Sequence, residues 1–321
     1  MYSLKNKTIL VTGGTGSFGK SFVRHLLENK KLKKVIVLSR DELKQYQMRK
    51  EIRGDKLRFF IGDVRDLNRL RRAFSKVDVV VHAAALKQVP TLEYNPFEAV
   101  KTNIMGTQNV IEAAIDEGVG RVLLVSTDKA AHPSNLYGST KLCAEKLFVA
   151  ANSYSSKTKF SVVRYGNVIA SRGSFIETLL NNEKKVEVTD LNMTRFWISL
   201  GQTNDLMEFA LRNMVGGELF VSKIPSMSIK ELIDVLAPKA VIKTIGLRPG
   251  EKMHEVLITN QEARHTVDLG KHYVILPEFP FWDRNIHKKY YRDGKKLEEG
   301  FCYASNTNKS RLSASELKKI L

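Results

Sequence analysis

A glycine-rich turn near the start of the chain limits the possible folds more than any other feature. Gly13, Gly16 and Gly19 follow the apolar run 8–12 and precede a helical pattern over 17–28. Glycines at this spacing allow a tight turn and bring bare backbone close to a pyrophosphate at the start of a helix. A glycine motif alone is weak evidence, but its position between a strand and a helix predicts a dinucleotide-binding turn.

Strand-like runs alternate with helical patterns through the first half of the chain. After the first strand and helix, further strands are predicted at residues 35–39, 57–61, 79–82, 121–126 and 160–165. Helical patterns accompany them at residues 41–49, 66–74, 97–117 and 137–152. Near-continuous apolar strands between helices are typical of a parallel sheet that is covered on both faces. We therefore predict an α/β fold with a doubly wound parallel Rossmann sheet.

The regular alternation of strands and helices ends after residue 167, and shorter elements follow. We predict that 1–167 form the cofactor-binding Rossmann domain, to which later segments return. Residues 168–321 are predicted to form mainly a smaller C-terminal substrate-binding lobe and a tail. Such a lobe would lie at the carboxyl edge of the sheet, where ligands of these folds bind.

Composition and charge exclude several classes of protein. The two cysteines, Cys143 and Cys302, make no disulfide framework or metal-ligand cluster, so no metal site is predicted. The apolar stretches are far too short to span a membrane and the N-terminus lacks a signal-peptide pattern, so we expect a cytoplasmic protein. The net charge of +18 comes from scattered residues. We interpret it as a solvated surface with a few cations for phosphorylated ligands, and not as a nucleic-acid-binding surface.

The end of the second predicted strand distinguishes NADP from NAD. This strand ends at Ser39 and Arg40, and Lys44 lies one helical turn further on. A carboxylate at this place usually binds the ribose hydroxyls of NAD, whereas arginine and lysine suit a 2′-phosphate, so we predict NADP. Asp41 is counted with this site, although it could instead cap the following helix.

Further cofactor contacts are predicted after the third and fourth strands. Asp63 and Val64 have the placement of an adenine contact, but a turn-capping aspartate is an equal interpretation. Ala83, Ala84 and Ala85 are small enough for backbone to approach a cofactor, which close packing would explain equally well. Within the glycine turn, the predicted contacts also include Thr15, Ser17 and Phe18.

Two motifs carry the predicted chemistry. Tyr137 and Lys141 share a helix face, and an ammonium beside a phenol favours phenolate, which can accept a proton from an alcohol. Thr127 supplies a hydroxyl at the end of the fifth strand, followed by Asp128 and Lys129. A C4 epimerase needs only the first three groups. The additional acid and base are what the elimination of water across C5 and C6 of a 4-keto sugar requires, although an ordinary surface turn is the alternative.

The chain resembles the extended short-chain dehydrogenase/reductases, and closely the inverting UDP-N-acetylglucosamine 4,6-dehydratases that open pseudaminic acid biosynthesis. The resemblance covers most of residues 5–260. Its ungapped blocks are residues 12–19, 39–44, 60–66, 93–96, 102–106, 126–130, 135–141, 164–168, 193–197 and 248–252.

The resemblance implies a role for each matching residue. Asp128 would be the acid for the C6 hydroxyl, Lys129 the base at C5, and Tyr137 the C4 catalyst that also reprotonates C5. Lys141 and Lys87 would help to hold the cofactor or the substrate. The substrate, UDP-N-acetylglucosamine, would be bound by Lys87, Asn103, Asn167, Ser174, Thr194, Arg195, Arg248 and Glu251. The resemblance also implies a tightly held NADP that is recycled within each turnover, and a homo-oligomer.

Three alternatives stay open. A UDP-sugar C4 epimerase would retain the oxygen at C6, which Asp128 and Lys129 argue against. A 4,6-dehydratase/5-epimerase of another sugar pathway shares nearly every motif but favours methionine in place of Tyr137. A catalytically silent Rossmann protein would keep the glycines without a reason to keep Tyr137, Lys141, Asp128 and Lys129 together.

Overall fold

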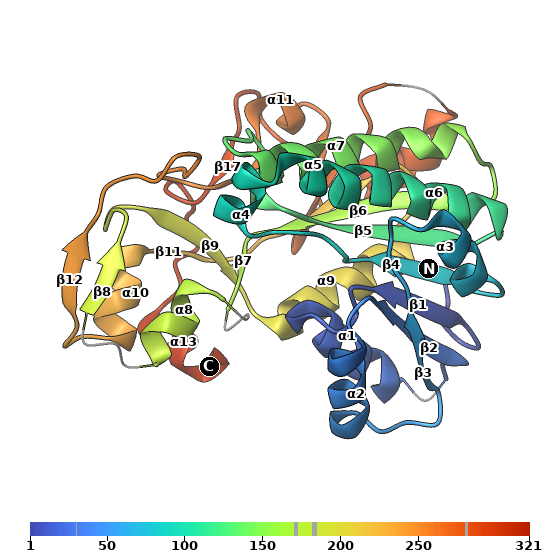
Figure 1. Ribbon diagram of the computed structural model, residues 1–321. Helices are drawn as coiled ribbons and strands as arrows, with labels where there is room; N and C mark the ends of the chain where they lie inside the picture. The colour runs from blue at the N-terminus through green and yellow to red at the C-terminus, as the bar shows by residue number, and fades with distance from the viewer. Residues whose placement is uncertain (30, 170–172, 182–184, 280–281) are drawn as a thin grey trace.

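A mostly parallel sheet forms the centre of the molecule (Figure 1). The structure, a computed structural model, describes residues 1–29, 31–169, 173–181, 185–279 and 282–321. Seven neighbouring strands are parallel, in the order β3 (Leu57–Ile61), β2 (Lys34–Ser39), β1 (Thr8–Thr12), β4 (Val79–His82), β5 (Arg121–Thr127), β6 (Lys159–Tyr165) and β10 (Leu219–Ser222). The antiparallel strands β15 (His272–Ile275), β14 (Thr266–Asp268) and β16 (Lys295–Lys296) continue the sheet beyond β10. The order of the first six strands is that of a dinucleotide-binding Rossmann sheet, which confirms the predicted fold class.

Helices cover both faces of this sheet. One face carries α3 (Leu67–Phe74), α6 (Gly106–Asp116) and α7 (Leu136–Ala150), and the other carries α1 (Ser17–Glu28), α2 (Glu42–Glu51) and α9 (Leu200–Asn213) (Figure 1). Because both faces are covered, β1 and β4 are buried along their whole length. The apolar core therefore lies in two layers on either side of the sheet, and the strand ends are left to present polar groups.

The predicted helix over 97–117 is interrupted in the structure. Its first turn is α5 (Pro96–Ala99), a π-helical segment η1 (Val100–Met105) follows, and only then does α6 begin. A further short helix, α4 (Val89–Tyr94), precedes α5 and was not predicted. The π segment turns Asn103 inward, where its side-chain amide donates to the Leu86 carbonyl oxygen at 2.9 Å and its oxygen accepts from the Leu86 N–H at 2.8 Å.

The C-terminal lobe is built around a second, smaller apolar cluster. Its elements include β7 (Asn167–Val168), β9 (Thr194–Ile198) and β11 (Ser226–Ser228), which form one sheet, and the helices α8 (Phe175–Leu180), α10 (Ile229–Leu236) and α13 (Ala314–Ile320). The pair β8 (Lys185–Val188) with β12 (Val241–Thr244) completes it, whereas the pair β13 (Val256–Ile258) with β17 (Tyr303–Ala304) packs against the main core. Short elements fill the connections: η2 (Asp128–Ala130), η3 (Ala151–Ser153), α11 (Asn260–Ala263), η4 (Arg284–His287) and α12 (Lys288–Asp293). The functional division at residue 167 stays a prediction.

One buried guanidinium joins the sheet, helix α7 and the lobe. Arg164 lies on β6 with none of its surface exposed, and its Nη2 lies 2.6 Å from Glu145 Oε2 and 2.8 Å from Glu262 Oε1. Its Nη1 also donates to the carbonyl oxygen of Leu257 at 2.9 Å. A buried charge is costly unless it is paired and hydrogen-bonded, and Arg164 meets both conditions.

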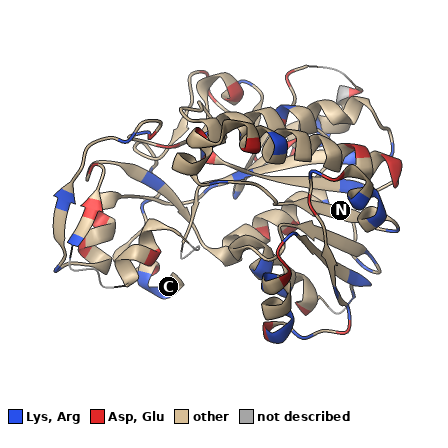
Figure 2. Ribbon diagram, viewed as in Figure 1, with Lys and Arg blue, Asp and Glu red and all other residues tan. Residues whose placement is uncertain are grey.

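The surface charge is spread out. Figure 2 shows Lys and Arg distributed over the helices and loops of both parts of the molecule, with Asp and Glu among them. Of the helices in the described ranges, none has the length and apolar character that crossing a membrane would need.

Candidate active site

The glycine turn depends on close backbone contacts. Gly13 has a positive φ of 66°, and a Cβ there would lie 2.8 Å from the backbone nitrogen of Ala84. A Cβ on Gly19 would lie only 2.5 Å from the Cα of Gly14. Gly16 caps α1 without a side chain, so the start of the helix carries bare backbone. This arrangement fits a pyrophosphate, which needs backbone amides and the positive end of a helix.

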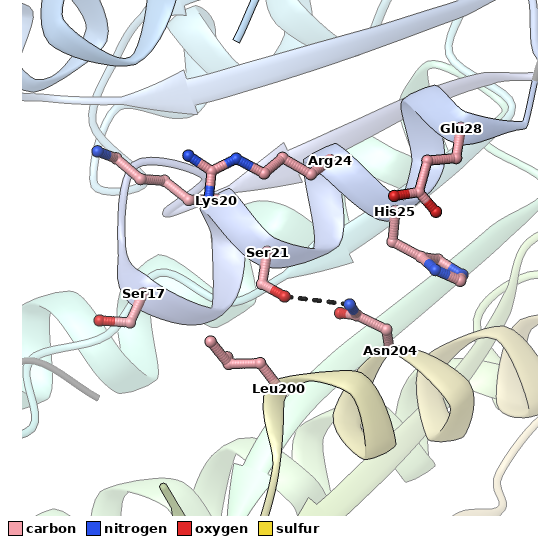
Figure 3. Close-up of a pocket in the computed structure, with 8 residues that line it drawn as sticks. All are labelled: Ser17, Lys20, Ser21, Arg24, His25, Glu28, Leu200 and Asn204. Carbon is pink, nitrogen blue, oxygen red and sulfur yellow. Dashed lines mark hydrogen bonds between the residues drawn. The ribbon is translucent and has the colours of Figure 1, made fainter. Parts of the chain in front are cut away.

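The other predicted residues of the turn differ in position. Thr15 is buried, and the ring of Phe18 stacks on that of Phe22 with 5.7 Å between centroids. Ser17 lines a polar pocket of about 540 Å³ between α1 and α9, in which Asn204 donates to the Ser21 hydroxyl at 3.1 Å (Figure 3). Of the described residues that line this pocket, Ser17 alone belongs to the predicted cofactor site, and none is a predicted catalytic residue.

The residues after β2 and β3 form a charged rim. Asp41 caps α2 by accepting from the Lys44 N–H at 2.9 Å, and the Lys44 ammonium lies 2.7 Å from it, which lowers the pKa of Asp41. Asp63 accepts from the Arg65 N–H at 3.0 Å and lies 3.5 Å from Arg40 Nη1. Asp41 therefore caps a helix and Asp63 caps a turn, which are the alternatives to cofactor binding that the sequence left open. Arg40 itself is exposed at the rim, where a 2′-phosphate could reach it.

Ser39 and Val64 are less accessible than these charged residues. Ser39 is buried and its hydroxyl accepts from the Gln45 amide at 3.0 Å. Val64 is buried too, and it lies so close to Gly106 that a Cβ there would be only 2.8 Å from its side chain. Any contact of these two residues with a cofactor would have to come from their backbone.

The small residues after β4 are held by a buried threonine and histidine. The N–H groups of Ala83 and Ala84 both donate to Thr12 Oγ1 at 3.2 Å. Burial lowers the pKa of His82 to about 3, so its ring is neutral and its Nδ1 accepts from the Thr12 hydroxyl at 2.8 Å. Ala85 follows in the same segment and is half-buried. The segment lies directly against the glycine turn, because Ala84 is the residue that a side chain at position 13 would strike.

The predicted acid and base lie together in η2, immediately after β5. Lys129 Nζ is 3.1 Å from Asp128 Oδ1, which also accepts from the Thr127 hydroxyl at 2.9 Å. Asp128 is fully buried, and its Oδ2 has no hydrogen-bond partner among the described residues. Burial raises the pKa of Asp128 although Lys129 acts against this. For Lys129, burial alone would lower the pKa, but the carboxylates of Asp128 and Glu255 raise it overall.

Helix α7 brings the tyrosine to this pair. Asn135 caps the helix by accepting from the Gly138 N–H at 2.9 Å. A Cβ on Gly138 would overlap the carbonyl oxygen of Lys129, so glycine is needed for α7 to lie against η2. The approach places Thr127, Asp128 and Lys129 within electrostatic reach of the Tyr137 phenol.

The pKa values of the tyrosine and its lysine are both shifted by burial. Burial raises the pKa of Tyr137 to about 12, while Lys129 and a hydrogen bond with Thr127 act in the opposite direction. Burial lowers the pKa of Lys141 to about 8, although Glu145 acts against this. The sequence pattern predicts a phenol that ionises more easily. The protein alone instead favours the protonated phenol, because burial and the charge of Asp128 outweigh the effects of Lys129 and Thr127 on the pKa of Tyr137.

Sequence reasoning missed two charged residues of the site. Glu255 is 3% exposed, and its Oε1 lies 3.4 Å from Lys129 Nζ and 3.8 Å from Arg195 Nε. Lys252 Nζ lies 3.5 Å from Glu255 Oε2 and donates to the Ala131 carbonyl oxygen at 2.7 Å. The sequence does contain one signal for Glu255, which directly precedes the apolar run 256–258. A glutamate at such a place is expected to be buried, and a buried glutamate is rare unless it is paired. We call Asp128, Lys129, Arg195, Lys252 and Glu255 the acid–base cluster.

Several residues predicted to bind substrate are engaged within the protein. Asn103 is 2% exposed and donates to the Thr140 hydroxyl at 3.0 Å as well as to Leu86. Thr194 bonds His254 and Ser305 at 2.9 and 2.7 Å. Arg195 Nη1 donates to the carbonyl oxygens of Thr194 and Met253 at 2.9 and 3.1 Å. Asn103 and Thr194 therefore connect neighbouring elements, whereas Arg195 also contacts Glu255 of the acid–base cluster.

The remaining residues predicted to bind substrate are Lys87, Asn167, Ser174, Arg248 and Glu251. Lys87 is exposed, and its pKa is lowered by burial of part of its chain and by the charge of Lys129. Arg248 is exposed, and its N–H donates to the half-buried Glu251 at 3.3 Å. Asn167 starts β7, and Ser174 caps α8 by accepting from the Glu177 N–H at 3.3 Å.

The loop that carries Arg248 is fixed to the start of helix α7. The carbonyl oxygen of Gly250 accepts from the Ser134 hydroxyl at 2.8 Å and from the Asn135 amide at 2.9 Å. A Cβ on Gly250 would lie 2.9 Å from that of Asn135. The lobe therefore contacts α7 at the same turn that presents Tyr137.

Comparisons with known proteins agree with this architecture. A family model described as polysaccharide biosynthesis protein matches residues 9–277. The chain is 47% identical to the UDP-N-acetylglucosamine 4,6-dehydratase (inverting) of Campylobacter jejuni, over 100% of this chain and 98% of the relative. It is 42% identical to a Rickettsia bellii protein named UDP-glucose 4-epimerase, over 98% and 95% of the two chains. The solved structure of Pen from Bacillus thuringiensis superposes with a TM-score of 0.89 at 39% identity, covering 99% of this chain and 98% of the other.

The family model covers residues 9–277 and the relatives match 98–100% of the chain, so the matches include both the sheet and the lobe. The Rossmann strand order, the glycine turn and the tyrosine and lysine on α7 are all present within the matched residues. The chain belongs to the polysaccharide biosynthesis protein family of the extended short-chain dehydrogenase/reductases.

Proposed function

We propose that this protein is a UDP-N-acetylglucosamine 4,6-dehydratase that inverts C5. The observation that carries the proposal is the buried contact between Asp128 and Lys129, 3.1 Å apart, beside the Tyr137 helix. A reaction confined to C4 has no use for this second acid and base. The 47% identical Campylobacter jejuni relative, which carries this name, supports the same activity.

Each group has a defined part in the proposed reaction. Tyr137 accepts the proton of the C4 hydroxyl, and the nearby ammonium groups stabilise its phenolate. Lys129 then takes the C5 proton, and the electron pair of that C–H bond forms the C5–C6 double bond as the C6–O bond breaks. Asp128 gives its proton to the departing oxygen, which leaves as water. Tyr137 returns a proton to C5 from the opposite face, which inverts that centre.

The raised pKa of Asp128 suits its role as an acid, because a buried carboxyl with an unpartnered oxygen is available to donate a proton. The raised pKa of Lys129 does not suit its role as a base, because it favours the protonated ammonium and a base must be neutral. The two roles are compatible because the proton of the ion pair can pass from Lys129 to Asp128 along their hydrogen bond.

We propose NADP as the cofactor. The glycine turn would hold its pyrophosphate, and Arg40 and Lys44, which lie beside Asp63 and Asp41, would bind its 2′-phosphate. The bound nicotinamide would supply the oxidation at C4 and the matching reduction at C6. The pathway to pseudaminic acid, a cytoplasmic location and a homo-oligomeric state are parts of the same proposal.

Proton NMR in deuterated water tests the reaction. With UDP-N-acetylglucosamine the wild-type protein should form a C6 methyl signal, deuterium at C5 and an L-arabino coupling pattern. Lys129→Ala should slow formation of the methyl signal by about 10²- to 10⁴-fold, the usual contribution of general base catalysis. Lys230→Ala, which removes an exposed lysine paired with Asp234 on α10, is the matched control and should leave the rate unchanged.

The same spectra separate the alternatives. A UDP-sugar C4 epimerase, which the Rickettsia bellii name supports, would change the C4 coupling without a methyl signal. A methyl product with retained C5 configuration would point to another type of dehydratase. A methyl product accompanied by later epimerisation at C5 would indicate the dehydratase/5-epimerase of another sugar pathway. Unchanged substrate would contradict all three activities.

A further inference from the structure

We infer that Glu255 is a positioning residue that holds Lys129 against Asp128 and stabilises the ammonium formed when Lys129 takes the C5 proton. The inference rests on the proposed dehydratase function and adds a residue to its mechanism. The Lys129 ammonium lies between two carboxylates, 3.1 Å from Asp128 Oδ1 and 3.4 Å from Glu255 Oε1. Asp128 precedes it in the chain, whereas Glu255 reaches it from the lobe.

The backbone of Glu255 is fixed from the side opposite to the lysine. Its N–H donates to the Ser305 hydroxyl at 2.9 Å, and its carbonyl oxygen accepts from the Ser305 N–H at 2.8 Å. The same hydroxyl donates to the Thr194 carbonyl oxygen at 3.0 Å. The position of the carboxylate is thus set by β9 and β17, and not by the flexible chain of Lys129.

The charges around Glu255 keep it ionised. Burial raises its pKa, but Lys129, Arg195 and Lys252 together lower it overall. Asp128 differs, because its one close cation does not outweigh burial and the repulsion of Glu255. Because the pKa values of these two neighbouring carboxylates are shifted in opposite directions, Glu255 stays charged while Asp128 can hold a proton.

The division matters in the elimination step. When Lys129 removes the C5 proton it becomes an ammonium, and Asp128 becomes a carboxylate as water leaves. Glu255 offers a fixed negative charge to the new ammonium at a buried site, where such charges interact strongly. The groups that face Glu255 are Lys129 from η2, Arg195 from β9 and Lys252 from the preceding loop, with Asp128 behind Lys129. Lys87 adds a positive charge near Lys129.

Steady-state kinetics of the full-length protein test the inference. Glu255→Gln keeps the shape and removes the charge, so kcat for the methyl product should fall by about 10- to 100-fold while KM changes less than about twofold. Asp128 and Lys129 titrate as a pair, and both of its pKa values fall when a nearby negative charge is removed. Both limbs of the kcat–pH profile should therefore move to lower pH, by about one unit.

Two further variants separate positioning from folding. Glu255→Asp keeps the charge on a shorter chain, so it should restore the wild-type position of the pH profile even where kcat stays reduced. Glu218→Gln is the matched control, because Glu218 is also fully buried but bonds Ser161 and Tyr290 instead, at 2.6 and 2.7 Å. It should lower thermal stability without moving the profile.

The outcomes are distinct. A Glu255→Gln profile that stays at the wild-type pH, or a kcat within about twofold of wild type, overturns the inference while the wild-type methyl product still supports the dehydratase. A wild-type protein that forms no methyl product overturns the proposed function, and the inference with it.

Discussion

The glycine turn and the acid–base cluster lie at the carboxyl edge of the same sheet, but they are held together by different physical forces. The turn works by excluded volume: Gly13 and Gly19 leave no room for a Cβ against Ala84 and Gly14. The cluster works by charge: Lys129, Arg195 and Lys252 surround the buried Glu255, and Lys129 also pairs with the buried Asp128. The turn involves the segment 13–19 and Ala84 after β4, whereas the cluster needs residues from the end of β5 to the lobe.

The difference predicts how each region fails. A single added methyl group should damage the turn, whereas the cluster should tolerate changes of shape better than changes of charge or of backbone position. Gly138 combines the steric and the electrostatic constraint, because close packing at this residue sets the distance between the charged residues of η2 and Tyr137.

Gly138→Ala should have the largest effect. The new Cβ overlaps the Lys129 carbonyl oxygen, so η2 must move away from α7. A misplacement of about 1 Å can cost about 100-fold in rate, and we expect a loss of that size in formation of the methyl product. Ser139→Ala on the next, exposed position is the control. A normal rate in a normally folded Gly138→Ala protein would show that this contact does not position the cluster.

Gly19→Ala should come next and should act on stability and cofactor binding. A Cβ 2.5 Å from the Cα of Gly14 forces the turn open, which should lower the free energy of unfolding by about 1–3 kcal/mol, as overpacking commonly does. Denaturant titration with and without NADP measures both effects. In Gly201→Ala, the control, the nearest atom is 3.8 Å away, so stability should be unchanged or up to about 1 kcal/mol higher. Equal stability of the two variants would contradict the steric account.

Arg40→Ala should have the smallest effect and should be selective. Loss of one arginine–phosphate contact should weaken NADP binding about tenfold, or about 1.4 kcal/mol, without a change in NAD binding. Isothermal titration calorimetry with both dinucleotides measures this. Lys50→Ala removes one positive charge from the same region, in the last turn of α2, and should change neither affinity. If Arg40→Ala weakened NAD binding as much as NADP binding, Arg40 would not be a specific contact of the 2′-phosphate.

The sheet could be predicted from the sequence because its signals are local. The predicted runs match β1, β3 and β4 residue for residue, and β2, β5 and β6 to within one residue. Each is a short apolar run between helical patterns, which a covered parallel sheet requires. The helix over 97–117 was predicted as continuous because nothing in its periodicity marks the π segment. That segment is favoured by tertiary contacts, above all those of Asn103 with Leu86.

The candidate site was predictable only where its residues share a helix or a turn. Tyr137 and Lys141 are one helical turn apart, and Thr127, Asp128 and Lys129 are consecutive. Glu255 carries no such pattern, because its partners Lys129 and Arg195 are distant in sequence. The inward engagement of Thr194 likewise depends on Ser305, near the end of the chain. Long-range pairing of single polar residues is what one sequence does not reveal.

The buried Arg164 has a consequence for how binding energy is used. It ties a strand, the catalytic helix through Glu145, and the segment that follows Glu255 through Leu257. The separation between the tyrosine and the lobe carboxylate is therefore built in before any sugar arrives. Such a preorganised site spends little of the substrate's binding energy on its own assembly. That energy remains available for interactions that form only in the transition state.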